Sequence, residues 1–239
     1  MTRYGPQFGP DITFLGVDRV DLDAPAALAA ADVVVIGAPF DGGTSHRPGT
    51  RFGPMAIRQT DYLPHDGSRP HLALRVDALR DLAVVDAGDV EMPPGEIERS
   101  LHALEEAVYA VARAGAIPLV LGGDHSIALS DATGVARHHG FDRVSMIHFD
   151  AHADTGHAPG TGTPEPGGLS SRQLLDAVRR ICRELPVAGI DVVEVSPPYD
   201  HAEITAFLAN RVCLEALSGL AARWHGISHD PAGPLLEGR

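Results

Sequence analysis

Five short runs of apolar and mostly β-branched residues limit the fold of this chain more than any other feature of its sequence. Strands buried on both faces of a parallel sheet have such nearly continuous runs. The segments between the runs repeat apolar residues at helical spacing, and alternation of strands with helices is typical of an α/β domain. We therefore expect a three-layer α/β/α fold with a mostly parallel sheet. The predicted strands are residues 33–38, 82–87, 118–121, 144–149 and 187–195.

The clearest helices are predicted over residues 97–111, 170–185 and 203–220. The second of them opens with Ser-Ser-Arg-Gln, the Ser-x-x-Gln form of a capping box. Together these elements predict a single domain over residues 1–225. Residues 226–239 are polar and contain glycine and proline, so we expect them to form a frayed tail.

The negative net charge of the chain limits the classes of partner that it can bind. The formal net charge is −13, and all 19 basic residues are arginine because the sequence has no lysine. A surface of this sign disfavours nucleic acid and anionic membranes. No uninterrupted apolar run approaches the roughly 18 residues that cross a bilayer, and residues 1–21 hold no basic stretch leading into an apolar segment. We expect no nucleic acid partner, no membrane partner and no secretory signal.

Two cysteines, Cys182 and Cys213, fall in segments of helical pattern. Free cysteines are among the most buried residue types. We therefore expect both to be small buried residues, with a disulfide or a reactive thiol as the weaker alternatives. Unpaired thiols are typical of a reducing compartment, so the sequence predicts a cytoplasmic location.

Three residues able to bind a metal alternate directly after the predicted strand 144–149. Asp150, His152 and Asp154 stand at i, i+2 and i+4, which puts their side chains on one face of an extended chain. Burying two carboxylates beside an imidazole is unfavourable unless a cation balances them. His125 ends the preceding strand and loop in Gly-Gly-Asp-His-Ser, where two glycines allow a sharp turn. These four residues predict a metal site, and Asp124 is predicted to orient a ligand from outside the coordination sphere.

Two long loops rich in glycine and proline, residues 41–54 and 155–168, follow predicted strands. In open α/β sheets, ligands bind outside the carboxyl ends of the strands, so we expect these loops to border the site rather than to be mere surface connections. Carboxylate and imidazole ligands without a thiolate suit Mn²⁺ better than Zn²⁺ or Mg²⁺. A metal that lowers the pKa of its bound water toward 7 makes hydroxide available, so the expected chemistry is hydrolysis.

These motifs resemble those of a known family. Residues 122–126 (Gly-Gly-Asp-His-Ser) and 150–154 (Asp-Ala-His-Ala-Asp) resemble the first two metal motifs of the ureohydrolases, the family of arginase, agmatinase and guanidinobutyrase. Residues 36–58 are similar to the family's loop on the substrate side, and the length of this stretch favours the agmatinase and guanidinobutyrase branch. Residues 158–169 resemble the segment that closes the site, and residues 191–200 resemble the last strand.

The resemblance implies an arginase-like fold and a set of roles. His125, Asp150, His152 and Asp154 would bind Mn²⁺, with Asp150 bridging two ions. Glu165 matches the glutamate that faces the guanidinium group of the substrate, and a carboxylate can meet a planar guanidinium in a bidentate pair. The implied reaction is hydrolysis of a linear guanidino compound, such as agmatine or 4-guanidinobutyrate, to an amine and urea. We expect this small cationic substrate as the partner, and a homo-oligomer.

One family motif is missing. The third metal motif, Ser-x-Asp-x-Asp-x-x-Asp-Pro, is absent, and the closing segment begins at Ala158, directly after Asp154-Thr-Gly-His. A βαβ unit takes 30 or more residues, so an internal deletion of about 60–90 residues is indicated. By the family pattern, one ion keeps three protein ligands and the other keeps two, so we expect one ion per chain. Nothing in the sequence places the remaining residues able to act as ligands, which are His157, Asp191, Glu194 and Asp200, in the vacant positions.

The deletion also bears on the sheet and on the function. With the middle strand gone, the last strand is expected to pair directly with residues 144–149 in a five-stranded sheet instead of the usual eight, or else to leave exposed edges. Two functions stay open: a ureohydrolase, and a non-catalytic metal-binding pseudoenzyme or subunit of the same family. The histone-deacetylase-like relatives, which share the fold and use one metal, are a third possibility by fold analogy only.

Overall fold

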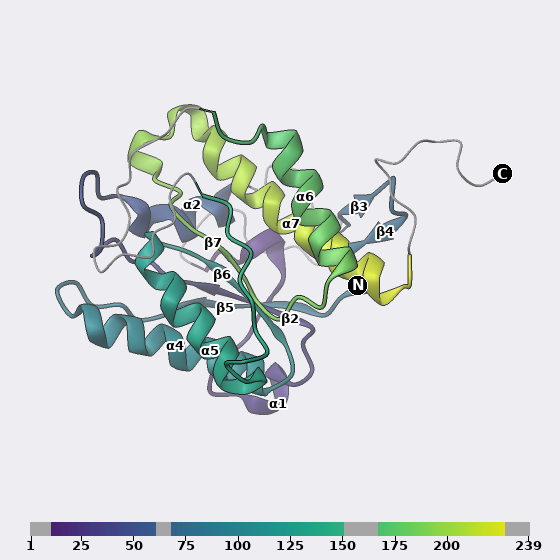
Figure 1. Cartoon of the computed structure of the whole chain (residues 1–239), viewed down its shortest axis with the longest axis horizontal. Helices are drawn as coiled ribbons and strands as arrows, with labels where there is room; N and C mark the ends of the chain where they lie inside the picture. The colour runs from purple at the N-terminus through teal and green to yellow at the C-terminus, as the bar shows by residue number, and fades with distance from the viewer. Residues whose placement is uncertain (1–10, 61–67, 151–166, 228–239) are drawn as a thin grey trace.

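Five parallel strands form a central sheet in the order β1-β5-β2-β6-β7 (Figure 1). The computed structural model describes residues 11–60, 68–150 and 167–227. The neighbouring strands of this sheet all run parallel, and a separate antiparallel hairpin joins β3 to β4. The predicted α/β class and mostly parallel sheet are confirmed. The strands are β1 (Asp18–Arg19), β2 (Val33–Gly37), β3 (Pro70–His71), β4 (Val76–Asp77), β5 (Val84–Asp89), β6 (Ile117–Leu121) and β7 (Ile190–Val192).

Helices cover both faces of the sheet and complete three layers (Figure 1). One face packs against α4 (Ile97–Arg113) and α5 (Ala128–His139). The other packs against α2 (Gly53–Gln59), α6 (Ser171–Glu184) and α7 (Ile204–Trp224). The remaining helices are short: α1 (Pro25–Leu28), α3 (Ala78–Asp81) and the 3-10 turns η1 (Phe14–Gly16), η2 (Thr50–Phe52), η3 (His125–Ile127), η4 (Pro197–Tyr199) and η5 (His201–Glu203).

Strand β2 explains why the apolar runs lack a polar face. Val33 and Val35 belong to the core beneath α2, α6 and α7, whereas Val34 and Ile36 belong to the core beneath α4 and α5. All four side chains are fully buried. A strand covered on both faces has no position at which a polar residue meets water, so its sequence is apolar throughout.

The predicted start of the second long helix is confirmed. The Ser170 hydroxyl accepts a bond from the Gln173 backbone N–H, and the Gln173 side chain accepts one from the Ser170 N–H at 2.9 Å. This reciprocal pair satisfies two backbone donors that the first turn of α6 cannot satisfy itself.

The predicted strand 144–149 is wrong, because these residues lie outside the sheet. Strand β7 occupies the position beside β6, with Leu119 opposite Ile190 and Leu121 opposite Val192. Each edge of β6 can take only one partner, and the packing of β7 residues into the core with α6 and α7 favours β7. Residues 144–149 are therefore coil, and three large side chains in them are 45–57% exposed: Met146, Ile147 and Phe149. The sheet has five strands within the described residues, but β1 is one of them in place of residues 144–149, so the expected pairing of the last strand with residues 144–149 is wrong.

Helix α7 is the central helix of its layer. The stretch His201–Trp224 is long and apolar enough to cross a membrane by length and composition, although polar residues interrupt it. In this protein 67% of its most apolar window is buried, so the apolar residues of α7 form part of the core.

Cys213 on α7 and Cys182 on α6 are both buried and unpaired, as predicted, and burial raises the pKa of each thiol to about 12.

A buried ion cluster around Glu215 of α7 ties three elements together. Its carboxylate accepts bonds from Arg179 of α6 at 2.7 Å and from Arg211 at 2.6 Å. The Nε2 atom of His71, in the β3–β4 hairpin, lies 3.3 Å away. Burial alone would raise the pKa of Glu215, but the bonds from His71, Arg179 and Arg211 outweigh it and lower the pKa to about 2.

This shift predicts a stability that depends on pH. A carboxyl whose pKa falls on folding stabilises the native state above its unfolded pKa of about 4.5, and the stabilisation is lost as pH falls toward 2. Glu215→Gln should lower the free energy of unfolding at pH 7 by about 1–3 kcal/mol, because it leaves buried donors with a weaker partner. Urea unfolding between pH 7 and pH 2 should show a shallower decline for Glu215→Gln than for wild type. Exposed Glu91→Gln is the matched control, and a wild-type pH profile in Glu215→Gln would contradict the assignment.

Candidate metal centre

The end of β6 leads directly into the turn that carries the first predicted ligand. The Gly122 N–H donates to Val192 O of β7 at 2.8 Å, and the Gly123 N–H donates to Ala38 O, after β2, at 3.0 Å. A Cβ atom on Gly123 would lie 2.4 Å from Phe40 O, so glycine is needed for this close approach. The turn is therefore clamped between the carboxyl ends of two neighbouring strands.

Asp124 fastens this turn to the loop that follows β2. Its buried carboxylate caps η3 by accepting from the backbone N–H of Ser126, and it also accepts from the Ser126 hydroxyl. It also accepts from the Gly43 N–H at 2.7 Å and from the Thr44 hydroxyl at 3.4 Å. Asp124 thus holds the turn that carries His125 against the loop after β2.

Two predicted ligands meet at this turn, together with a histidine that was not predicted. His125, His148 and Asp150 each offer one ligand atom, and these atoms lie within 4.8 Å of one another. The ring centroids of His125 and His148 are 4.7 Å apart at an interplanar angle of 70°. The other predicted site residues, His152, Asp154 and Glu165, lie outside the described residues, so their roles stay predictions.

His148 carried a signal in the sequence that went unused. It stands two residues before Asp150, so it continues backwards the same alternation that groups Asp150 with His152 and Asp154. Residues 144–149 were expected to form a strand buried on both faces, in which His148 would be a core residue. Their position outside the sheet makes His148 available to the site.

Two further carboxylates lie on the same side of the sheet. Asp191 of β7 is opposite Val120 and shares a sheet face with Val193, which packs into the core under α4 and α5. Crowding by surrounding protein raises the pKa of Asp191, although the residue is open to solvent, and nearby His125 and His148 lower it. Asp131 of α5 is buried, and neither of its carboxylate oxygens has a partner among the described residues. Burial, together with the charge of Asp191, raises the pKa of Asp131 well above its usual range.

This donor set fits a divalent cation. One carboxylate and two imidazoles, whose ligand atoms lie within 4.8 Å of one another, form a donor set that a divalent cation can bind. The Nδ1 atom of His125 is also buried without a hydrogen-bond partner in the part of the chain that the structure describes. Since buried polar atoms are normally satisfied, these atoms are where a bound ion and its water would find partners.

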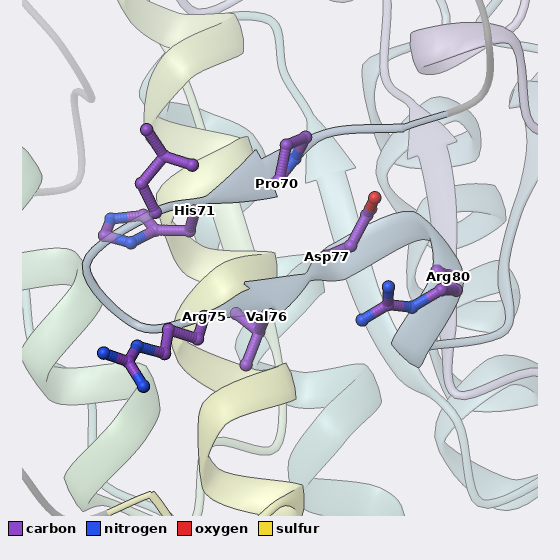
Figure 2. A pocket seen from close by; sticks show the side chains of 7 residues that line it. Pro70, His71, Arg75, Val76, Asp77 and Arg80 are labelled. Carbon is purple, nitrogen blue, oxygen red and sulfur yellow. The ribbon is translucent and has the colours of Figure 1, made fainter.

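Two other features near the surface are separate from this group. His102, Glu105 and Glu106 cluster on α4, but both glutamates pair with Arg137, which already balances their charge. A cavity of about 250 Å³ lies on the β3–β4 hairpin and the start of α3 (Figure 2). Its lining shares no residue with the metal group: Pro70, His71, Leu72, Arg75, Val76, Asp77 and Arg80.

Comparison with protein families shows which family this sequence matches. The model described as the arginase family matches residues 31–158 and 154–219, which together span most of the chain. The chain belongs to the arginase family. The two matched segments overlap at residues 154–158, the point at which the third metal motif of the family is missing from the sequence.

Several curated relatives cover most of the chain. Proclavaminate amidinohydrolase of Streptomyces clavuligerus is 31% identical over 78% of this chain and 87% of its own length. Agmatinase of Bacillus subtilis is 29% identical over 79% of this chain and 92% of its own length. Guanidinobutyrase of Pseudomonas aeruginosa is 27% identical over 89% and 93%. The first alignment has 278 positions but holds only 78% of these 239 residues, about 186, so about 90 positions have no residue here.

Solved structures bear out the fold. The structure of proclavaminate amidinohydrolase covers 92% of this chain with a TM-score of 0.79 and 28% identity, and all of that chain is covered. Formiminoglutamase of Trypanosoma cruzi, solved with Mn²⁺, covers 81% of this chain and 94% of its own with a TM-score of 0.69 at 20% identity. The arginase-like fold implied by the sequence motifs is therefore confirmed.

The close approach at Gly123 gives a test of the turn. Gly123→Ala should destabilise the fold by about 1–3 kcal/mol, because the backbone carbonyls of Ala38 and Phe40, in the chain after β2, would have to move away from the new Cβ atom. Denaturant unfolding measures this change. Gly168→Ala is the matched control, since a Cβ atom there meets no atom of the described residues within 4 Å. Equal stabilities of the two variants would contradict the role given to the turn.

Proposed function

We propose that this chain is a metal-dependent hydrolase that cleaves a linear guanidino compound, of the agmatine or 4-guanidinobutyrate type, and releases urea. The observation that carries the proposal is the meeting of His125 and Asp150 at the carboxyl end of the sheet. The family resemblance gives both residues as metal ligands. Membership of the arginase family supports the proposal, as do agmatinase and guanidinobutyrase among the relatives.

In this proposal some residues bind the metal and another binds the substrate. His125 and Asp150, with His152 and Asp154, would hold the metal, for which we propose Mn²⁺, the ion in the T. cruzi formiminoglutamase structure. A bound ion of this kind supplies hydroxide by lowering the pKa of its water toward 7. Glu165 orients the substrate by a bidentate pair with two guanidinium nitrogens.

The setting of the activity follows from charge and thiol chemistry. A chain with a net charge of −13 attracts a small cationic substrate and repels nucleic acid and anionic membranes. Two buried, unpaired cysteines agree with a reducing compartment, so we propose a cytoplasmic location. By the family resemblance we also propose a homo-oligomer.

A second candidate function is a non-catalytic metal-binding member of the same family. The observation that favours it is the missing third metal motif, at the point where the family match divides in two. A hydroxide that bridges two ions needs them about 3.5–4 Å apart, and the lost aspartates are ligands to both ions in the family pattern. Such a protein would bind one ion and turn over no substrate.

Urea release from the purified full chain separates the two candidates. The assay uses agmatine, 4-guanidinobutyrate and arginine, each with Mn²⁺ and with Zn²⁺. The hydrolase should release urea from one of the first two. Glu165→Gln should then lower kcat/KM by about 100-fold or more, because the guanidinium loses its orienting charge. Exposed Glu98→Gln is the matched control. No release from any substrate, by a folded sample that holds metal, contradicts the hydrolase and supports the second candidate.

A further inference from the structure

Arg47, in the loop between β2 and η2, is an exposed arginine without an acidic partner among the described residues. We propose that its guanidinium binds a carboxylate at the far end of the substrate, so that this chain prefers guanidino acids such as 4-guanidinobutyrate to guanidino amines such as agmatine. The inference rests on the proposed function, because it names the substrate class of the same site.

The loop that carries Arg47 is bonded to the turn of the metal group. Asp124, which directly precedes His125, accepts from the Gly43 N–H at 2.7 Å and from the Thr44 hydroxyl at 3.4 Å. Arg47 follows Thr44 by three residues, so their Cα atoms are at most about 11 Å apart. Arg47 is therefore tied closely to the turn that positions His125.

The segment after β7 borders the same turn and holds the ring on which Arg47 lies. The Glu194 N–H donates to Gly123 O at 2.8 Å, directly after the end of β7. Tyr199, in η4, is 48% exposed, and the Cζ atom of Arg47 lies 5.5 Å from the centroid of its ring. Arg47 thus connects the two segments that flank the turn of His125.

The charge of Arg47 is left unbalanced by the carboxylates nearest to it in the chain. Arg51, four residues later, takes the carboxylate of Asp41 at 2.6 Å. Asp200, directly after η4, accepts at 2.9 Å from two backbone N–H groups at the start of α7. Although the chain has 32 acidic and 19 basic residues, Arg47 pairs with none of the described carboxylates, so its charge is available to an anion from solution.

An arginine placed over an aromatic ring can still bind a carboxylate. Attraction to a ring within about 6 Å orients the guanidinium. Its N–H donors lie in the guanidinium plane, where they can meet a carboxylate in a bidentate pair. The tail of agmatine is an ammonium group, which would meet a like charge at Arg47 and be repelled. With the substrate guanidinium at the metal group, Arg47 therefore favours a carboxylate tail.

Two ligands that differ in the charge of the tail test the proposal. Titration calorimetry on the full chain with Mn²⁺ should show tighter binding of 4-guanidinobutyrate than of agmatine. Arg47→Ala should weaken 4-guanidinobutyrate about 10–100-fold, the loss of one charged bidentate contact, without weakening agmatine. Arg47→Glu should reverse the preference.

Arg113→Ala is the matched control and should bind both ligands as wild type does. Arg113 is also exposed and also lies over a tyrosine, 5.7 Å from the Tyr109 ring centroid. It ends α4 before the start of β6, and therefore lies at the opposite edge of the sheet from the metal group. Far-ultraviolet circular dichroism checks that each variant is folded.

Three results overturn the proposal: no binding of 4-guanidinobutyrate, tighter binding of agmatine by wild type, or an equal effect of Arg47→Ala on both ligands. Urea release, measured in parallel, judges the hydrolase separately. Selective binding of 4-guanidinobutyrate without urea release supports the role of Arg47 and contradicts the hydrolase. Urea release from agmatine, equal in wild type and Arg47→Ala and faster than from 4-guanidinobutyrate, supports the hydrolase and overturns the role of Arg47.

Discussion

Parallel pairing between β6 and β7 brings Leu121 opposite Val192, and the bond from the Gly122 N–H to Val192 O continues that pairing past the end of β6. The next residue, Gly123, bonds on its other side to the chain after β2 and accepts from Glu194 N–H at 2.8 Å. Three strands thus meet at two glycines. The position of His125 and the location of residues 144–149 both depend on this junction, because β7 pairs with β6 and residues 144–149 lie outside the sheet.

Acidic side chains accept many of the hydrogen bonds that hold the chain around this junction. Asp41 accepts from the Gly49 N–H at 2.9 Å and from Arg51 at 2.6 Å; burial would raise its pKa, but Arg51 lowers it. Asp124 holds the same loop from the other side through Gly43. Asp86 of β5 accepts two bonds from buried Arg58, at 2.9 and 3.0 Å. Part of the negative charge of the chain therefore stabilises the loops and the sheet locally.

The sequence predicted best what a single segment determines by itself. The runs at β2 and β6 identified buried strands because residues such as Val34 and Leu119 are apolar on both faces. The capping box at Ser170 identified a helix start through a local bond. The meeting of His125 with Asp150 was also predicted, but the expected strand before Asp150 is coil, so the resemblance to the metal motifs was a better guide here than the strand pattern.

What the sequence could not predict depends on competition between distant segments. Residues 144–149 have the composition of a buried strand, yet a three-residue strand that packs with α6 and α7 takes the place beside β6. The two-residue strands β1, β3 and β4 are too short to leave a periodic pattern. The buried Asp131 has no local signal either, since a helix shows which residues share a face but not what that face will meet.

The coil of residues 144–149 has a consequence for the chain among its own copies. Val-Ser-Met-Ile-His-Phe is a six-residue window rich in apolar residues, without a formal charge or a proline, and Met146, Ile147 and Phe149 are exposed. Windows of this kind associate readily with identical segments of other molecules when they are not held in a sheet. The outer edge of β7 has no strand partner within the described residues. The exposed window and the open edge of β7 therefore favour aggregation of this chain, which would lower the protein concentration at which it stays soluble.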